Sequence, residues 1–197
     1  MRLQREFFER DTLTVARDLL GTVLVRELNG TRLSGRVVEV EAYTGWDDLA
    51  SHGYRGPTPR NEVMFGTAGF SYVYLIYGMY WLLNVVAKPR TADYPAAILI
   101  RALEPLEGVD MMAERRVGQP VHGWASGPGK LTIALDIGPE LGNLDLTAPG
   151  SPLYFVPGDP LPDAAVSVGP RIGLNVAEPW QSQPWRFWEA DNPHVSR

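Results

Sequence analysis

The first periodic segment of the chain has helical spacing. Asp11 or Thr12 can cap a first turn, and Gly21 stands where helices commonly end. The apolar residues between them fall on one helical face: Leu13, Ala16, Leu19 and Leu20. These positions predict a short amphipathic helix between the cap and Gly21.

The next two segments have the period of β-strands. Residues 22–28 read as one strand, and the Asn29-Gly30 pair that follows is a strong signal for a two-residue hairpin turn. Alternation along the returning strand, residues 31–45, predicts two faces. One face holds Val37, Glu39, Glu41 and Tyr43, and the other holds Val38, Val40 and Ala42. Two acids therefore point the same way as an aromatic ring.

The segment Phe70 to Ala87 runs for 18 residues without a charge. A membrane-spanning helix needs about 20 apolar residues, but Gly78 and Asn84 interrupt this run and its aromatic residues are spread throughout. The pattern predicts two strands joined at Tyr77-Gly78, where glycine permits a tight turn. Such a hairpin is either an ordinary buried one or a surface that presents Tyr77 at its tip to a flat ligand.

The remaining pattern mixes strands and helices. Residues 96–105 predict a buried strand that contains Arg101, residues 106–116 a helix, and residues 126–135 a turn that becomes a helix. Later strands are predicted at 153–156, 166–174 and 185–188. Strands and helices do not alternate as they do in a doubly wound sheet. We therefore predict an α+β fold in a single domain that spans residues 1–197.

Composition supports one loop-rich globular core. A chain of 197 residues buries roughly 70% of its unfolded surface, and 20 Gly with 17 Pro indicate many turns. The absence of cysteine excludes a disulfide framework. The charged N-terminal segment does not resemble a signal peptide, so we expect a cytoplasmic, nucleoid-associated protein with no targeting segment and no membrane partner.

Charge is unevenly distributed. The net charge of −5 argues mildly against nucleic acid, because affinity for phosphates comes from Lys and Arg. Residues 52–130, however, hold eight basic and six acidic side chains, and they include the aromatic segment. The only net-positive third of the chain is therefore also the most aromatic one.

Candidate chemistry centres on two strands. A lone Glu in a strand is more often a solvated residue than a catalyst, but Glu41, beside Tyr43, suits a partly desolvated carboxylate aimed at a pocket. Glu39 on the same face is the competing candidate. Arg101 lies in a buried strand and needs a carboxylate partner, either for structure or to help hold a reacting water. His52 lies in the loop after the Glu41 strand, where a pocket role and an ordinary loop position are equally open.

No metal or cofactor site is predicted. His52, His122 and His194 lie far apart and lack the spacing of a zinc site. The sequence also lacks phosphate-binding, dinucleotide-binding and nucleophile-elbow motifs. We expect no metal, no cofactor and a reaction that uses water.

Several motifs occur in a specific order along the chain: Glu41-Ala42-Tyr43, His52, TPRN at 58–61, Met64-Phe65, YVYLIYGMYWLLN at 72–84, RALEP at 101–105 and SGPGKL at 126–131. In that order, and over nearly the whole chain, the sequence resembles the alkyladenine (3-methyladenine) DNA glycosylase family. The resemblance implies a compact single α+β domain with a curved antiparallel sheet, surrounding helices and a protruding β-hairpin that enters the DNA minor groove.

The resemblance also implies roles for individual residues. By motif, Glu41 is the general base, and Arg101 and the main-chain carbonyl of Ile172 help to hold the water. The base pocket is lined by Tyr43, His52, Tyr74 and Asn84, of which Asn84 discriminates among purines, and Tyr77 is the DNA wedge. Contacts with the DNA backbone are expected from Arg60, Met64 and Lys130. The segment 88–96 looks longer than is usual in the family, which leaves contacts near Lys88 and Arg90 open.

The implied function is a monofunctional DNA glycosylase of base excision repair. Such an enzyme acts as a monomer on double-stranded DNA and releases alkylated or deaminated purines, here 3-methyladenine and further 7-methylguanine, hypoxanthine or ethenoadenine. Two alternatives use the same aromatic residues: a non-catalytic nucleic-acid-binding module and an enzyme that acts on free nucleosides. A tip tyrosine favours DNA over a free nucleoside, because a small-molecule pocket has no use for a wedge.

Overall fold

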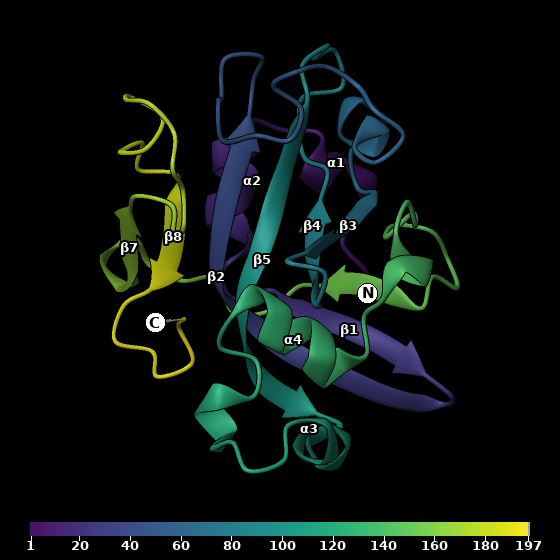
Figure 1. The fold of residues 1–197 in the computed structure, drawn as a ribbon. Helices are drawn as coiled ribbons and strands as arrows, with labels where there is room; N and C mark the ends of the chain where they lie inside the picture. The colour runs from purple at the N-terminus through teal and green to yellow at the C-terminus, as the bar shows by residue number, and fades with distance from the viewer. Residues whose placement is uncertain (197) are drawn as a thin grey trace.

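The computed structural model describes residues 1–196 and is built on one antiparallel sheet. The main path of the sheet is β3 (Ser71–Ile76), β4 (Tyr80–Val85), β5 (Ala96–Glu107), β2 (Thr31–Thr44), β1 (Val23–Leu28) and β6 (Leu153–Val156). Two further strands, β7 (Val166–Gly169) and β8 (Arg186–Glu189), pair with each other, and β8 also pairs with the middle of β2. The long β2 and β5 cross the centre of the molecule, with β3–β4 on one side and β7–β8 on the other (Figure 1).

Within residues 1–196, four α-helices lie around this sheet. They are α1 (Arg5–Phe8), α2 (Thr12–Leu19), α3 (Val109–Arg115) and α4 (Pro128–Leu135). Short 3₁₀ turns lie at Glu62–Phe65, Val121–Gly123, Pro139–Leu141 and Asp163–Ala165. Helix α2 packs on β2 and β5, and α4 packs on β4 and β5. Helices α1 and α2 lie behind the sheet in Figure 1, whereas α3 and α4 lie in front of its lower end. The predicted fold class, a single α+β domain with a curved antiparallel sheet and surrounding helices, is confirmed.

Local sequence signals account for the ends of several elements. Asp11 caps α2, since its carboxylate accepts a hydrogen bond from the Thr14 N–H. Asn29 and Gly30 both have positive φ, as the predicted two-residue hairpin between β1 and β2 requires. The charge-free segment likewise forms the β3–β4 hairpin, with Tyr77 and Gly78 at positive φ in its turn.

Strict alternation along β2 is wrong at one point. The pairing of β2 with β5 shifts register between Val37 and Glu39 and again before Val40, which marks a β-bulge. The bulge returns Val37 to the core cluster that also contains Val40 and Ala42, instead of placing Val37 on the face of the acids. Glu39 and Glu41 still share a face, since both contact Arg101.

The strand predicted at 166–174 is shorter than expected. Strand β7 ends at Gly169, and residues 170–174 form an irregular loop. Pro170 lacks the N–H that would continue the ladder, and Gly173 has a φ of +74°. This loop brings Ile172 to the site described below. Within residues 1–196, no helix is both long and apolar enough to pass through a bilayer.

Candidate active site

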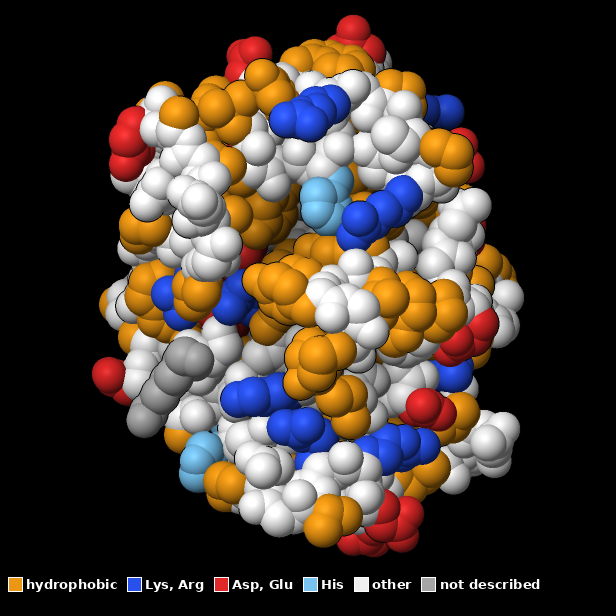
Figure 2. Space-filling model, in the orientation of Figure 1, with side chains coloured by type: hydrophobic (Ala, Val, Ile, Leu, Met, Phe, Trp, Pro, Cys, Tyr) orange, Lys and Arg blue, Asp and Glu red, His pale blue; other side chains and the backbone are white. Residues whose placement is uncertain are grey.

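A cavity of about 270 Å³ opens where β2, β5 and the β3–β4 hairpin meet. Loops at residues 50–52 and 172–174 complete its walls. The aromatic side chains in its lining are Tyr43, His52, Tyr72, Tyr74 and Tyr77. Figure 2 shows the surface hollowed near a histidine, with hydrophobic side chains around the opening. The cavity thus has flat aromatic walls and lies beside a projecting hairpin.

Glu41 projects into this cavity from β2 and is fully buried. Its Oε1 lies 3.2 Å from Arg101 Nη1 and accepts a 2.7 Å hydrogen bond from the Ile172 N–H. Its Oε2 accepts a 2.7 Å hydrogen bond from the Tyr43 hydroxyl. A carboxylate oxygen can accept about two hydrogen bonds, so Oε2 retains one acceptor site.

The competing acid, Glu39, lies outside the cavity lining and accepts four hydrogen bonds. Its Oε1 accepts hydrogen bonds from Arg101 Nε at 2.9 Å and Arg186 Nε at 2.7 Å. Ser196 donates to the same carboxylate through its N–H at 2.7 Å and its hydroxyl at 2.9 Å. Because Glu39 is absent from the cavity lining and Glu41 is part of it, Glu41 is the acid that faces the cavity.

Arg101 joins the two acids. Burial alone lowers the pKa of its guanidinium, but Glu41 and Glu39 raise that pKa by a larger amount, so the side chain stays charged. Arg101 was expected to have a carboxylate partner, and it has two, Glu39 and Glu41. This arrangement balances the buried charges of Glu39 and Glu41 with Arg101 and Arg186.

The aromatic walls contact one another edge to face. The rings of His52 and Tyr74 lie 4.5 Å apart at 71°, and His52 Nδ1 is 2.8 Å from the Tyr72 hydroxyl. Burial lowers the pKa of His52, and nearby Arg60 lowers it further, which keeps the imidazole neutral at pH 7. Burial raises the pKa of Tyr72 to about 12 and that of Tyr43 well above its usual value, the latter with help from Glu41. The walls are therefore uncharged, and Tyr43 remains a donor to Glu41.

Asn84 lies on the β4 side of the cavity and is buried. Its Nδ2 donates a 3.1 Å hydrogen bond to the carbonyl of Tyr72, the residue opposite it in the hairpin. The side chain thus both lines the cavity and supports the β3–β4 ladder. A structural role and a role in purine selection are both compatible with this position.

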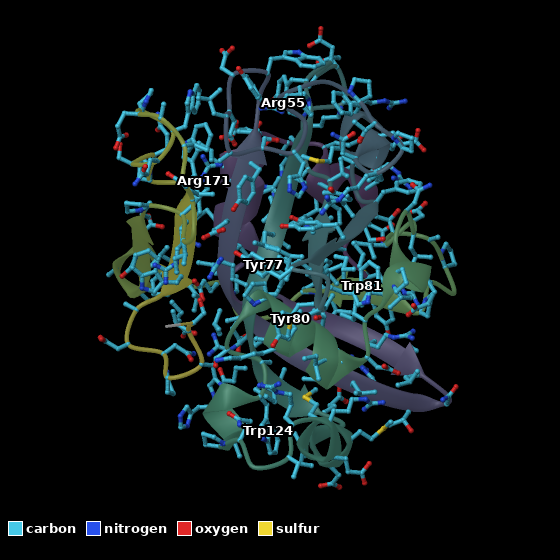
Figure 3. The ribbon with its side chains drawn as sticks, in the orientation of Figure 1. Arg55, Tyr77, Tyr80, Trp81, Trp124 and Arg171 are labelled. Carbon is cyan, nitrogen blue, oxygen red and sulfur yellow. The ribbon has the colours of Figure 1, made fainter. Side chains whose placement is uncertain are left out.

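The hairpin tip is the most exposed aromatic part of the molecule within the described residues. Tyr77 is 83% exposed and Met79 is 67% exposed. Tyr77 also lines the cavity, and Figure 3 shows it in front of the β2–β5 pair. This geometry agrees with the predicted tip position and contradicts an ordinary buried hairpin.

The three residues expected to contact the DNA backbone differ in position. Arg60 and Lys130 are exposed, Arg60 near Tyr74 at the cavity and Lys130 on α4. Figure 2 shows Lys and Arg side chains gathered over the region of α3 and α4. Met64 is only 2% exposed and packs with Tyr72 and Ala97 in the cavity wall, so its side chain is not placed to meet a phosphate.

Lys88 is also buried. Its Nζ donates hydrogen bonds to the Phe65 and Tyr94 carbonyls at 2.8 and 3.0 Å, so it fixes the loop before β5 and does not face outward. Arg90, two residues later, is exposed. Of the two basic residues in the segment 88–96, only Arg90 is therefore placed to meet a phosphate.

Sequence reasoning missed two buried residues next to the site, Asp48 and Arg171. Their side chains form an ion pair with a 2.6 Å contact, and both are 0% exposed. A basic residue directly before Ile172 was the available signal, but its acidic partner lies 123 positions away. The sequence motif likewise gave Tyr72 no role of its own, although its hydroxyl contacts His52 and its carbonyl accepts from Asn84.

Comparison with known proteins identifies the family. A family model described as Methylpurine-DNA glycosylase matches residues 6–193. The chain belongs to this methylpurine-DNA glycosylase family. As predicted, it falls in the class of DNA glycosylases, which are hydrolases acting on N-glycosyl bonds.

Relatives of this glycosylase match over nearly their whole length. A protein of Desulfitobacterium hafniense is 46% identical over 99% of this chain and 98% of its own. Those of Myxococcus xanthus and Methanocella arvoryzae are 46% and 47% identical, each over 99% of this chain and over 93% and 96% of their own. All three carry the name "Putative 3-methyladenine DNA glycosylase". Among residues 1–196 of this glycosylase, no group of three or more His, Cys, Asp or Glu is arranged to hold a metal ion.

Proposed function

We propose that this glycosylase rotates alkylated or deaminated purines out of duplex DNA into the aromatic cavity and releases them with a water activated by Glu41. One observation carries the proposal: a buried carboxylate with a remaining acceptor site faces an aromatic cavity directly beside an exposed hairpin tip. The name of the relatives supports 3-methyladenine as a substrate. We extend the proposal to 7-methylguanine, hypoxanthine and ethenoadenine.

Base rotation explains the shape of the site. An atom inside a duplex is out of reach, and extruding the nucleotide costs a few kcal/mol, less where pairing is already weakened. In our proposal Tyr77 fills the space that the base leaves. The extruded base then stacks against Tyr43 and Tyr74, and each stacking contact contributes about 1–3 kcal/mol. A cationic alkylated purine gains further from the negative faces of these rings, and the neutral His52 does not repel it.

Glu41 is suited to the chemical step. Breaking the N-glycosidic bond leaves an oxocarbenium-like sugar, and its electrons leave with the base. Water attacks the sugar carbon, and its proton passes to Glu41 Oε2, the oxygen with a remaining acceptor site. An N3- or N7-alkylated purine departs as a neutral base, so it needs no second acid. Arg101 and the Ile172 N–H hold the other oxygen in place.

Incubation of the purified protein with methylated duplex DNA tests the proposal directly. Free 3-methyladenine should appear, and the sugar–phosphate strand should stay intact until alkali is added. Binding without base release would support a non-catalytic binding module. Release from free methylated nucleosides at the rate seen with duplex DNA would support the nucleoside enzyme.

Replacing Tyr77 with alanine should weaken base rotation. The variant loses the ring that fills the vacated stack, and loss of a stacking contact of about 1–3 kcal/mol corresponds to about 5- to 150-fold in excision from duplex DNA. Thermal stability should be almost unchanged because the ring is 83% exposed. Stopped-flow fluorescence of a 2-aminopurine beside the lesion would follow the rotation.

The matched control for this wedge is Tyr77→Phe, which keeps the ring and should retain most of the activity. Full activity of Tyr77→Ala on duplex DNA would contradict the wedge role. A loss of several kcal/mol in the free energy of unfolding would show that the tip ring supports the fold instead.

Replacing Asn84 with serine should increase release of normal guanine relative to hypoxanthine. Guanine carries a 2-amino group that hypoxanthine lacks, and an amide in the cavity wall either clashes with it or loses its own partners. An unsatisfied buried polar group costs about 1–3 kcal/mol, or about 5- to 150-fold in discrimination. Release of both bases from matched duplexes, measured by chromatography, gives the ratio.

The 3.1 Å bond from Asn84 to the Tyr72 carbonyl supplies the competing explanation. If Asn84 only supports the hairpin, Asn84→Ser lowers the free energy of unfolding and leaves the ratio of guanine to hypoxanthine release unchanged. An unchanged ratio in a folded variant would therefore remove the proposed selection role.

A further inference from the structure

The loop that brings Ile172 to Glu41 is largely exposed, so packing of its own residues does little to hold it in place. Ile172 is 41% exposed, and Gly173 beside it is also exposed and has positive φ. The loop nevertheless places the Ile172 N–H 2.7 Å from Glu41 Oε1. Something other than packing of these residues must hold the main chain at that distance.

Arg171, the preceding residue, is anchored by four hydrogen bonds. Nη1 and Nη2 bind the two oxygens of Asp48 at 2.6 and 2.9 Å, which makes a bidentate pair. Nη1 also donates to the Ala42 carbonyl at 3.0 Å, and Nη2 to the Trp180 carbonyl at 3.1 Å. Ala42 lies directly between Glu41 and Tyr43 on β2. The guanidinium therefore ties the loop to the strand that carries the proposed base.

The guanidinium also contacts the faces of two aromatic rings. Its central carbon is 4.6 Å from the centre of the Tyr43 ring and 4.9 Å from that of Trp185. Tyr43 lines the cavity but Arg171 does not. Arg171 thus supports Tyr43, which both walls the cavity and donates to Glu41 Oε2. Figure 3 shows Arg171 beside β2, on the side of β8.

We propose that Arg171, held by Asp48, is a positioning residue that sets the Ile172 N–H and the Tyr43 hydroxyl on the two oxygens of Glu41. The inference rests on the proposed role of Glu41 as base. Arg171 touches neither the cavity nor the reacting atoms, so it acts only through these two donors. A planar guanidinium suits this task because only arginine can pair bidentately with Asp48, reach two carbonyls and stack at the same time.

Stability alone is a weak reason for such a pair. Taking two charges out of water often offsets their mutual attraction, so a buried ion pair of this kind adds little net stability over apolar side chains. If Arg171 served stability alone, its replacement would leave the rate of catalysis unchanged in a protein that is still folded. A positioning role instead predicts a loss of rate in a folded variant that still binds DNA.

The test compares Arg171→Met and Arg171→Lys with a matched control, Arg5→Met. Arg5 also pairs with a carboxylate, Asp145 at 2.5 Å, and donates to a main-chain carbonyl, Ala68 at 2.6 Å, but it lies away from the cavity. A misplacement of about 1 Å can reduce a rate by about 10²-fold. We expect Arg171→Met to slow single-turnover release of 3-methyladenine by about 10- to 100-fold with unchanged affinity for lesion DNA. Arg171→Lys should fall between it and the wild type, and Arg5→Met should keep the full rate.

A second readout does not depend on activity. In the wild type the Ile172 amide proton should resonate downfield because it binds a carboxylate, and in Arg171→Met it should move upfield and exchange faster. If the wild type releases no base, the proposed function fails while this signal still reports on positioning. If the wild type is active and folded Arg171→Met keeps both rate and amide shift, the positioning role is overturned. Should Arg171→Met not fold, the nearly isosteric Asp48→Asn carries the same two measurements with the same expected directions.

Discussion

Replacing Glu41 with glutamine should slow base release by about 10²- to 10⁴-fold, the usual contribution of a general base. Glutamine keeps the size of the side chain, and its amide oxygen can still accept from the Ile172 N–H and Arg101. Its NH₂ group replaces Oε2 and cannot take a proton from water. The Tyr43 hydroxyl can turn to accept from that group, since a phenol is both donor and acceptor. The fold and the affinity for lesion DNA should therefore persist, as single-turnover kinetics and a binding assay on the same duplex would show.

Glu39→Gln is the informative comparison, because Glu39 shares the face and the arginine of Glu41 but lies outside the cavity lining. This variant should retain more activity than Glu41→Gln and lose more stability, since Arg186 and Ser196 both depend on its carboxylate. Near-normal excision by Glu41→Gln together with an inactive Glu39→Gln would move the base to Glu39.

Arg101→Gln should lower the free energy of unfolding by about 3–5 kcal/mol, the usual effect of removing one partner from a buried ion pair. Arg101 is only 7% exposed and its guanidinium contacts both Glu39 and Glu41. Without it, Arg186 is the remaining ion-pair partner of Glu39, and Glu41 keeps only the neutral donors Tyr43 and Ile172. Urea unfolding followed by tryptophan fluorescence would give the difference from the shift in midpoint at constant slope.

An ion pair with one fully solvated partner supplies the control for this stability effect. The Arg17 side chain is 24% exposed and pairs at 2.7 Å with Asp163, which is 99% exposed and stays solvated when Arg17 is replaced. Arg17→Gln leaves no buried carboxylate unpaired and its amide can still donate to the Leu161 carbonyl, so the midpoint should change much less. Equal losses in Arg101→Gln and Arg17→Gln would mean that the buried network contributes no more than a surface contact. Such a result would remove the argument that Arg101 holds the two acids in place.

Much of the local structure could be predicted from the sequence. The Asp11 cap, the Asn29-Gly30 turn and the Tyr77-Gly78 turn all depend on residues within a few positions of one another. Such features depend on short-range preferences for capping and for positive φ, and both preferences follow from residue types that the sequence shows directly. The family resemblance, through its ordered motifs, added the pocket residues and their roles, which periodicity alone did not supply.

The tertiary structure decided which of these residues face the cavity. A bulge in β2 places Val37 in the core. The bulge shows in the pairing of β2 with β5, and the alternation of residues along β2 alone does not predict it. Glu39 and Glu41 are equivalent in the sequence, but Ser196, 157 positions after Glu39, and Arg186 engage one acid and leave the other facing the cavity. The Asp48–Arg171 pair likewise joins segments 123 residues apart. A contact between distant segments depends on how the whole chain folds, so the local pattern determined the elements and only the folded chain determined the partners of each charge.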